Sequence, residues 1–276
     1  MTQEERRKLF MEKLKDMTLM HDEFMSAAFA DNIPAVELVI SLILQRSDLV
    51  VKDVTVQRTI ENLKGHSVRL DVLAVDNNGK WYNIEIQRAS KGAGAKRARY
   101  NSSLIDAELL EKNHDYSDLP ETYVIFITER DFFNAGKQLY HVERRIQETA
   151  TSFGDGTHII YVNGEYIDET PLGRLISDFH ATDAGKMHYD ILSERVYDLK
   201  ETEGGQYAMS EFMEEIAKAE RAEGKAEGIA EGEAKGRTEN ALQTALNMLK
   251  KQMSLNDIAD CTGLPIEKVQ ELALQV

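Results

Sequence analysis

The sequence predicts an α/β fold built on a mixed sheet, with the element order αβββαβ and a helical extension at its C-terminal end. Three observations lead to this prediction. Apolar residues recur at helical spacing before position 45, β-rich alternating segments lie between positions 49 and 87, and the run YVIFIT (123–128) is continuously apolar. These patterns are typical of a core helix, half-buried strands and a fully buried strand, respectively.

Each element has its own signal in the sequence. A core helix is expected within residues 21–45, where Val36, Val39 and Ile43 are among the apolar residues at helical spacing. The triplet Asn77-Asn78-Gly79 predicts a β-hairpin turn. The other expected elements are strands at 49–60, 68–75, 80–87 and 123–128, a helix at about 93–112, further strands within 138–166 and two helices within 171–200.

The composition divides the chain into three parts. Residues 1–204 contain every predicted strand and are expected to form one α/β domain. Residues 222–237 repeat a four-residue pattern (AEGK, AEGI, AEGE, AKGR). We therefore expect residues 205–240 to be either a helix stabilised by self-association, which we favour, or a flexible linker, because each glycine costs an isolated helix roughly 1 kcal/mol relative to alanine.

The last part, residues 241–276, predicts a small helical module that resembles a helix-turn-helix around Gly263. Glu267 and Glu271 lie on its second helix, where they would face phosphates. We therefore expect this module to pack or to mediate homo-oligomerisation rather than to bind DNA.

Cysteine content and hydropathy narrow the class of protein. The single cysteine, Cys261, excludes an internal disulfide and a multi-cysteine zinc site. No segment approaches the roughly 20 apolar residues of a membrane span, and residues 1–17 are charged where a signal peptide would be apolar. We expect a cytoplasmic protein without a membrane segment.

The formal net charge of −15 opposes nucleic-acid binding, because phosphates are held by Lys and Arg. Charges further away than roughly 8 Å are largely screened at cellular salt, so that a local basic patch can decide binding. The segment RASKGAGAKRARY contains no acidic residue and supplies such a patch, with Arg88, Lys91, Lys96, Arg97 and Arg99.

Asp71 and Glu85 lie on the two arms of the predicted hairpin, and the length of the turn decides whether they meet. A three-residue loop, 77–79, places them directly opposite each other, with Cβ atoms roughly 4.5–5.5 Å apart. A two-residue turn shifts the register by one and places them on opposite faces. Two opposed carboxylates repel unless a cation such as Mg²⁺ lies between them.

Alternation also places Gln87 on the face of Glu85, whereas Ile84 and Ile86 face the other way. An exposed polar strand face explains this pattern as well as a functional site does.

A resemblance that extends beyond these residues favours the functional site. The stretch RLDVLAVDNNGKWYNIEIQ resembles the D…ExQ hairpin of the recombination-promoting nuclease and putative transposase family, a branch of the PD-(D/E)xK superfamily. HDEFMSAAF, KRARY, LPETYVIFIT, THIIYVNGEY and the AEGK tail resemble the same family's layout, in the same order.

The resemblance implies roles for individual residues. Asp71 and Glu85 would bind the metal together with the backbone carbonyl of Ile86, and Gln87 would take the place of the superfamily's lysine. Glutamine offers only amide hydrogen bonds, so that the positive charge must come from Mg²⁺, or another divalent cation, and from Arg97 or Arg99. Tyr100 matches a family tyrosine that follows a basic residue, and it is a candidate DNA contact, whereas Asn101 departs from the family's second tyrosine.

The superfamily also places an acidic residue on its first helix. Glu37 interrupts an apolar helical stretch and is either that residue or an exposed helix position. Asp22 resembles a family position, although helix capping explains it better. Asp76 is expected to shape the turn, and structural or exposed positions explain His66, His141 and His158 better than a general base does.

Together these observations predict a metal-dependent DNA endonuclease of the PD-(D/E)xK type, in which Asp71, Glu85 and Gln87 are catalytic. The resemblance implies a role in recombination or transposition. The alternative is a catalytically inactive DNA-binding or assembly protein that retains the nuclease fold after loss of the lysine. A third reading is a helical oligomerisation protein whose hairpin carboxylates have no function.

Overall fold

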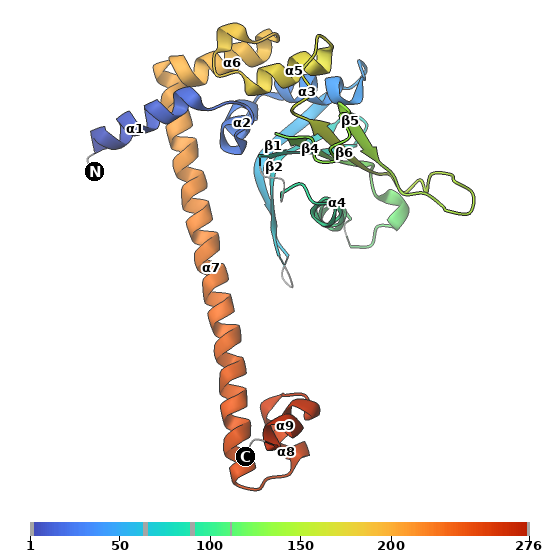
Figure 1. Cartoon of the computed structure of the whole chain (residues 1–276), viewed down its shortest axis with the longest axis vertical. Coiled ribbons are helices and arrows are strands. Elements are labelled where there is room, and N and C mark those ends of the chain that lie inside the picture. Colours follow the sequence, from blue (N-terminus) through green and yellow to red (C-terminus); the bar gives the residue numbers. More distant parts are fainter. Residues whose placement is uncertain (1–2, 63–65, 89–91, 111, 275–276) are drawn as a thin grey trace. The chain divides into compact units, whose positions relative to one another are not determined.

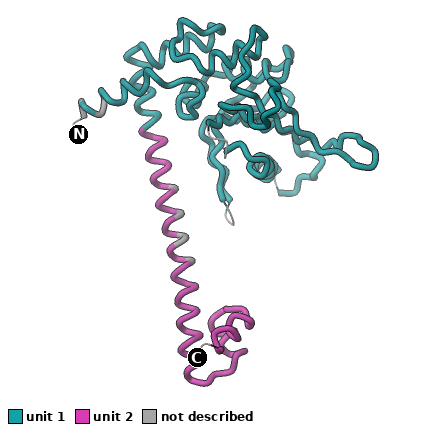
Figure 2. The backbone as a smooth tube through the Cα atoms, in the orientation of Figure 1, with its two compact units in different colours: residues 1–213 teal, residues 214–276 magenta. Residues whose placement is uncertain are grey.

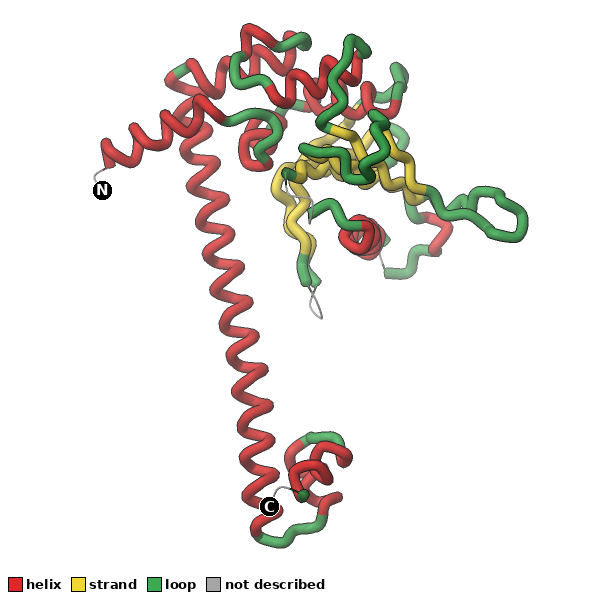
Figure 3. The backbone as a smooth tube through the Cα atoms, viewed as in Figure 1, coloured by secondary structure: helices red, strands yellow, loops and turns green. Residues whose placement is uncertain are grey.

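A six-stranded mixed sheet forms the core of residues 1–213 (Figure 1, Figure 3). The computed structural model describes residues 3–62, 66–88, 92–110 and 112–274. The strand order is β1-β2-β3-β4-β6-β5, with β3, β4 and β6 parallel and the other neighbours antiparallel. The strands are β1 (Val51–Ile60), β2 (Val68–Asp76), β3 (Trp81–Gln87), β4 (Thr122–Thr128), β5 (Leu139–Val142) and β6 (Thr157–Asn163).

Helices precede, interrupt and follow these strands. They are α1 (Gln3–Asp16), α2 (Asp22–Phe29), α3 (Ile33–Leu44), α4 (Ala95–Leu109), α5 (Pro171–His180), α6 (Asp190–Glu201), α7 (Glu203–Lys250), α8 (Leu255–Thr262) and α9 (Ile266–Ala273), with short 3-10 turns at Tyr116–Asp118 and Ala184–Lys186. The predicted mixed α/β class and the αβββαβ core are confirmed.

The prediction of one core helix within residues 21–45 was wrong, because the chain forms α2 and α3 instead. Asp31 adopts a φ of 54°, which ends α2, and the Asn32 side chain then caps α3 by accepting from the Ala35 backbone N–H (3.3 Å). Pro34 lies in the first turn of α3, where a missing N–H costs nothing. Apolar periodicity continues through this break, so that periodicity alone did not reveal it.

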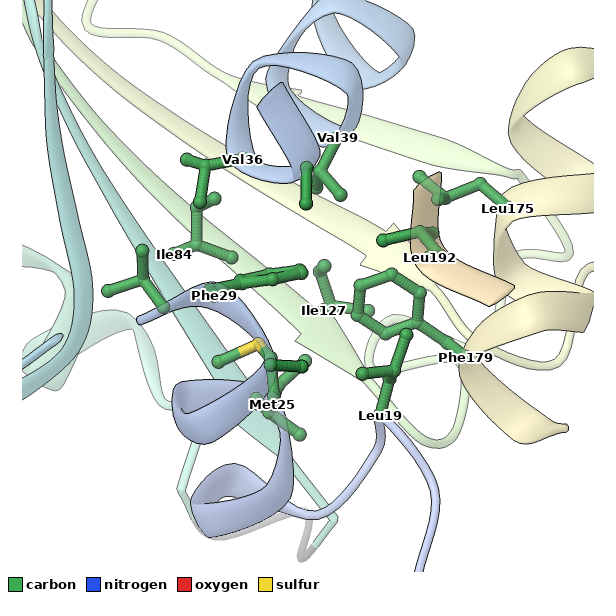
Figure 4. Packing of buried hydrophobic residues seen from close by; sticks show 14 of the residues in the cluster. Leu19, Met25, Phe29, Val36, Val39, Ile84, Ile127, Leu175, Phe179 and Leu192 are labelled. Carbon is green, nitrogen blue, oxygen red and sulfur yellow. The ribbon is translucent and has the colours of Figure 1, made fainter. Parts of the chain in front are cut away.

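Each face of the sheet is covered by its own helices. The first face packs against α2, α3, α5 and α6 in the larger core, where Phe29, Val36, Ile84, Ile127 and Phe179 are all buried (Figure 4). The second face packs against α4 through a smaller cluster that contains Ala98, Ile105, Phe126 and Tyr161. In β3, the even-numbered residues therefore face α2 and α3, and the odd-numbered residues face α4.

The described chain divides into two compact units, residues 1–213 and 214–276, and the boundary falls within α7 (Figure 2). The glycine repeat lies within this 48-residue helix, and a Cβ atom on Gly224, Gly228, Gly232 or Gly236 would meet nothing within 4 Å. The repeat is therefore helical in this structure. In the second unit α8 and α9 pack on the end of α7 around Ala245, Ile258, Val269 and Leu272.

Among the described residues, no single helix has both the length and the apolarity of a membrane span. The pair α2 and α3 meets that criterion only when taken together, across a bend of 116°.

Asp76 shapes the β2–β3 turn, as predicted. Its Oδ1 atom accepts from the backbone N–H groups of Asn78 (2.8 Å) and Lys80 (2.9 Å), and its Oδ2 atom accepts from the Tyr82 hydroxyl (2.9 Å). The residue is 1% exposed. The carboxylate thus holds the turn that sets the hairpin register.

We expect Asp76→Ala to lower the free energy of unfolding by about 3 kcal/mol, because three buried hydrogen bonds contribute about 1 kcal/mol each. Urea unfolding followed by the fluorescence of Trp81, the single tryptophan and a β3 residue, measures this loss. Asp76→Asn, which keeps one acceptor oxygen, should lose less. Equal stability of the alanine variant and the wild type would contradict the role assigned to this carboxylate.

Candidate metal and nucleic-acid site

The β2–β3 hairpin closes with the three-residue loop 77–79. Asp76 N–H donates to the Lys80 carbonyl (3.0 Å), and the ladder pairs Val75 with Trp81 and Val72 with Ile84. Continued by one step, this register sets Asp71 opposite Glu85. Of the two turns that the sequence allows, the structure has the one that brings the carboxylates together.

The regular pairing of β2 with both of its neighbours is interrupted at Asp71. On the β1 side, the ladder pairs Val56 with Val72 and Arg58 with Leu70 but leaves out Gln57, which adopts a φ of 50°. Ser26 of α2 fills this irregularity, because its hydroxyl donates to the Asp71 carbonyl (3.4 Å) and accepts from the Gln57 amide (2.7 Å). The distorted strand pair and α2 thus fix the backbone of Asp71.

On the β3 side, the ladder ends at Val72 and Ile84, and the Asp71 side chain takes the next position. Its Oδ2 atom accepts the backbone N–H of Ile86 (3.0 Å). The N–H and C=O of one strand residue point to the same side, so that the Ile86 carbonyl also faces β2. Gln87 faces the other neighbour, since its carbonyl accepts from Glu129 N–H (3.0 Å). The predicted third ligand therefore points toward Asp71.

Glu85 lies on the α4 face of β3 and is fully buried. Its Oε1 atom accepts from the Asn83 amide (3.1 Å), and its Oε2 atom accepts from Nη2 of Arg97 on α4 (3.0 Å). Nη1 of Arg97 also reaches Oε1 of Gln87 (3.5 Å). A cation from α4 thus joins the two β3 residues.

Burial raises the pKa of both carboxyl groups. For Asp71, which is 8% exposed, the pKa rises well above the usual value through burial and the charge of Glu85, while the Ile86 N–H and Arg97 oppose the rise. For Glu85 burial also raises the pKa, against the charge of Arg97 and hydrogen bonds from Asn83, the Asp71 backbone and Arg97. Both anions are thus costly here without a cation.

The first turn of α2 also contributes to the electrostatics of the site. The charge of Asp22, which is exposed, raises the pKa of Asp71. The neighbouring His21 has a pKa lowered by burial and then by Arg88. His21 is the N-cap residue of α2, and the Asp22 carboxylate accepts from the adjacent Glu23 N–H (3.0 Å). Asp22 thus accepts a first-turn N–H of α2, as a residue that stabilises the helix N-terminus does, and its charge also acts on Asp71.

Glu37, the predicted additional acid, lies apart from this site. Its Oε2 atom accepts the backbone N–H of Val51 (2.8 Å), at the end of β1 that pairs with Asp76. Asp71 lies five positions from Asp76 along β2. Glu37 therefore holds the start of β1, and the acid on a preceding helix whose charge raises the pKa of Asp71 is Asp22.

The predicted basic patch is only partly brought to the carboxylates. Arg97 contacts Glu85, whereas Lys96 and Arg99 are exposed on the first turns of α4. Arg88 lies on the α2 side, where its Nε is 3.7 Å from Glu129. Lys91 falls outside the described residues.

Tyr100 has a structural contact, because its hydroxyl donates to the His66 carbonyl and accepts from the Asn62 amide (2.9 Å). It ties α4 to the β1–β2 connection. Asn101, at the position where the family's second tyrosine was expected, is buried with a side-chain oxygen that has no partner among the described residues.

Three residues of the site were not predicted, namely Ser26, Gln57 and Asn83. Asn83 had a signal, because it lies two residues before Glu85 and so on the same strand face. Ser26 and Gln57 had none, since their contacts depend on an irregular strand pair.

The oxygen atoms of this site suit a hard divalent cation. Among the described residues no three His, Cys, Asp or Glu side chains form a metal-binding group. Mg²⁺ does not need one, because it keeps several waters and is held by one or two carboxylates. Asp71 and Glu85, with the Ile86 carbonyl, supply such a set, and a cation there would relieve the cost of burying two acids.

An Asp and a Glu opposed at the opening of a mixed αβββαβ sheet define a core of the PD-(D/E)xK nuclease type. The comparison with known families agrees. Residues 38–171, just under half of the chain, match the model of the PD-(D/E)XK nuclease family transposases. No curated protein and no solved structure gives a significant match. Nucleases of this family generally use divalent metal ions, and the family implies a DNA substrate.

We expect Asp71→Asn to be more stable than the wild type at pH 7 without divalent metal, because burial and the charge of Glu85 disfavour the ionised carboxylate in the folded state and asparagine carries no charge. The folded-state pKa of Asp71 is raised, so that stability falls as the pH rises above the unfolded value, about 3.9. The gain should shrink toward pH 4. Urea unfolding of both proteins in EDTA at pH 4 and pH 7 checks this, and a destabilised variant at pH 7 would refute it.

Proposed function

We propose that this chain is a metal-dependent DNA endonuclease that hydrolyses phosphodiester bonds and serves in transposition or recombination. The observation that carries the proposal is the pair of buried, opposed carboxylates of Asp71 and Glu85, with Arg97 bound to one of them. A buried pair of acids is costly in a protein that needs only a stable sheet. The match of residues 38–171 to a nuclease and transposase family supports the same function.

Each residue has a distinct task in this proposal. Asp71, Glu85 and the Ile86 carbonyl would hold the cation, Mg²⁺ in the first instance. When bound, Mg²⁺ lowers the pKa of a coordinated water and stabilises charge on the attacked phosphate. The Ile86 N–H fixes the rotamer of Asp71, and Asn83 and Arg97 fix that of Glu85.

Gln87 and Arg97 together replace the lysine of other superfamily members. The Gln87 amide orients a water molecule or a phosphate oxygen through hydrogen bonds. Arg97, 44% exposed at its side chain, carries the positive charge and can reach a phosphate with its second edge while it contacts Glu85. Lys96 and Arg99, exposed on the same helix, would hold the neighbouring phosphates.

A catalytically inactive DNA-binding protein with the same fold is the competing function, and the loss of lysine favours it. Arg97 weakens that argument, because it returns a positive charge to the place from which lysine is missing. A DNA cleavage assay distinguishes the endonuclease from the inactive DNA-binding protein. Binding of a divalent metal distinguishes both of these from a protein in which the two carboxylates have no function.

We also propose that the protein self-associates through its C-terminal helical region. The support is the exposed repeat of Gly224, Gly228, Gly232 and Gly236 in α7, which lets another helix approach closely and lowers the stability of an isolated helix. Light scattering of the full chain over a range of concentrations tests this directly. A monomer at all concentrations would exclude it.

In nicking of supercoiled plasmid, we expect activity with Mg²⁺, none with EDTA, and none detectable with Asp71→Ala or Glu85→Ala. Arg97→Ala should reduce the rate about 100-fold, as removal of a group that stabilises transition-state charge does. The matched control is Asp53→Ala, which removes an exposed carboxylate from β1. Nicking that persists in both carboxylate variants would locate the activity elsewhere and overturn the assignment.

Mg²⁺ should also raise the thermal unfolding temperature of the wild type, because a ligand that binds only the folded state stabilises it. Asp71→Ala should show no such rise, whereas Asp53→Ala should respond like the wild type. A wild type that neither nicks DNA nor responds to Mg²⁺ would favour the reading in which the carboxylates have no function. A response without nicking would favour the inactive DNA-binding protein.

A further inference from the structure

A row of aromatic rings leads away from Glu85 along the α4 face of the sheet. The strand register places Glu85 beside Phe126, Phe126 beside Tyr161, and Tyr161 beside Tyr140. Neighbouring strands lie about 4.8 Å apart, so that the Cα atoms of Glu85 and Tyr161 are separated by about 10 Å. The Phe126 and Tyr161 rings are stacked, with centroids 5.3 Å apart.

The loop after β4 lays two more rings on this row. It begins beside the site, where Glu129 N–H donates to the Gln87 carbonyl. The Phe132 ring stacks on Tyr161 (5.1 Å), and the Phe133 ring contacts Phe132 (5.0 Å), Tyr140 (4.8 Å) and Tyr161 (5.0 Å). Phe133 nevertheless remains 44% exposed. The Phe133 ring thus packs against three other rings and is still partly exposed to solvent.

Asp131 holds this loop in place. Its carboxylate accepts from the Tyr140 hydroxyl (2.7 and 2.8 Å), from Gly136 N–H (2.7 Å) and from Phe133 N–H (3.1 Å). Its own N–H donates to Glu165 (3.0 Å). Hydrogen bonds therefore hold the backbone at Phe133 and at positions before and after it in the chain.

We propose that Phe133 is a stacking platform for an unpaired base of the DNA substrate, a few nucleotides from the scissile phosphate. This inference rests on the proposed nuclease function and names a further substrate contact for the same site. Aromatic rings that stack bases tolerate any sequence, because every base has a π-face. Arg130 and Lys137, both exposed on the same loop, would contact the phosphates on either side of that base. The preferred substrate accordingly contains a single-stranded segment.

The test measures binding of the full-length protein to a fluorescent single-stranded DNA oligonucleotide and to its duplex, in Ca²⁺. Phe133→Ala should weaken single-strand binding at least about fivefold, since stacking contributes roughly 1–3 kcal/mol per base. Duplex binding should change less. Phe133→Tyr should bind like the wild type, whereas Phe133→Leu, which keeps apolar packing but cannot stack, should resemble Phe133→Ala.

Phe153→Ala is the matched control, because it removes a ring of comparable exposure (59%) from the β5–β6 connection. It should leave single-strand binding unchanged. A 2-aminopurine base in the oligonucleotide adds a direct signal, as its fluorescence should be quenched by the wild type, Phe133→Tyr and Phe153→Ala but not by Phe133→Ala or Phe133→Leu.

Different outcomes would contradict the stacking proposal and the nuclease proposal on which it rests. Wild-type binding and nicking, with Phe133→Ala indistinguishable from the wild type on both DNA forms, would overturn the stacking platform and leave the nuclease intact. A wild type that binds neither DNA form would overturn both. If Phe133→Ala weakened binding to single-stranded and duplex DNA equally, the stacking proposal would also be rejected, because the substitution would then have disrupted the loop as a whole.

Discussion

The hydrogen bond between the Asp71 carboxylate and the Ile86 N–H is the contact on which the site depends. It occupies the position where the β2–β3 ladder would otherwise continue, so that the two strands part with one carboxylate between them. The parting leaves the Ile86 carbonyl facing the same gap and Glu85 next to it. Ser26 and Gln57 stabilise the matching irregularity on the β1 side. A defect in strand pairing is thus what creates a ligand set.

Burial makes this arrangement expensive, and the surrounding residues offset only part of the cost. Arg97, Asn83 and backbone N–H groups lower the pKa of the two acids, yet desolvation remains the dominant effect on both. The remaining imbalance favours a bound cation, and the large core around Phe29 and Phe179 supplies the stability that the site uses. Asp178, in contrast, shows how the same protein buries an acid for structure alone, with donors from His188 and Tyr189 on both oxygens.

The sequence predicted the regular parts of the fold and the residues that regular alternation brings together. The β-hairpin follows from turn chemistry and period-two patterning, which left two registers open, and the structure has the one that opposes Asp71 and Glu85. The resemblance offered Arg97 or Arg99 as the cation, and the structure brings Arg97 to Glu85. The division of residues 21–45 into two helices and the separation of Glu37 from the site did not follow, because each depends on local backbone geometry at Asp31 and Val51. The role of α2 could not be predicted from the sequence either, since Ser26 and Asp71 are 45 positions apart in the chain.

The placement of the positive charge on α4 has a consequence for how such a site can vary. A lysine two residues after the metal-binding glutamate moves with that glutamate, because both belong to one strand. Arg97 belongs to a separate helix, which docks through Ala98 and Ile105 and is tethered by Tyr100. If the proposed function holds, substitutions in the α4 interface would change the electrostatic contribution of Arg97 without altering the strands that carry Asp71 and Glu85. Ion affinity and phosphate activation would then be separately adjustable properties of one site.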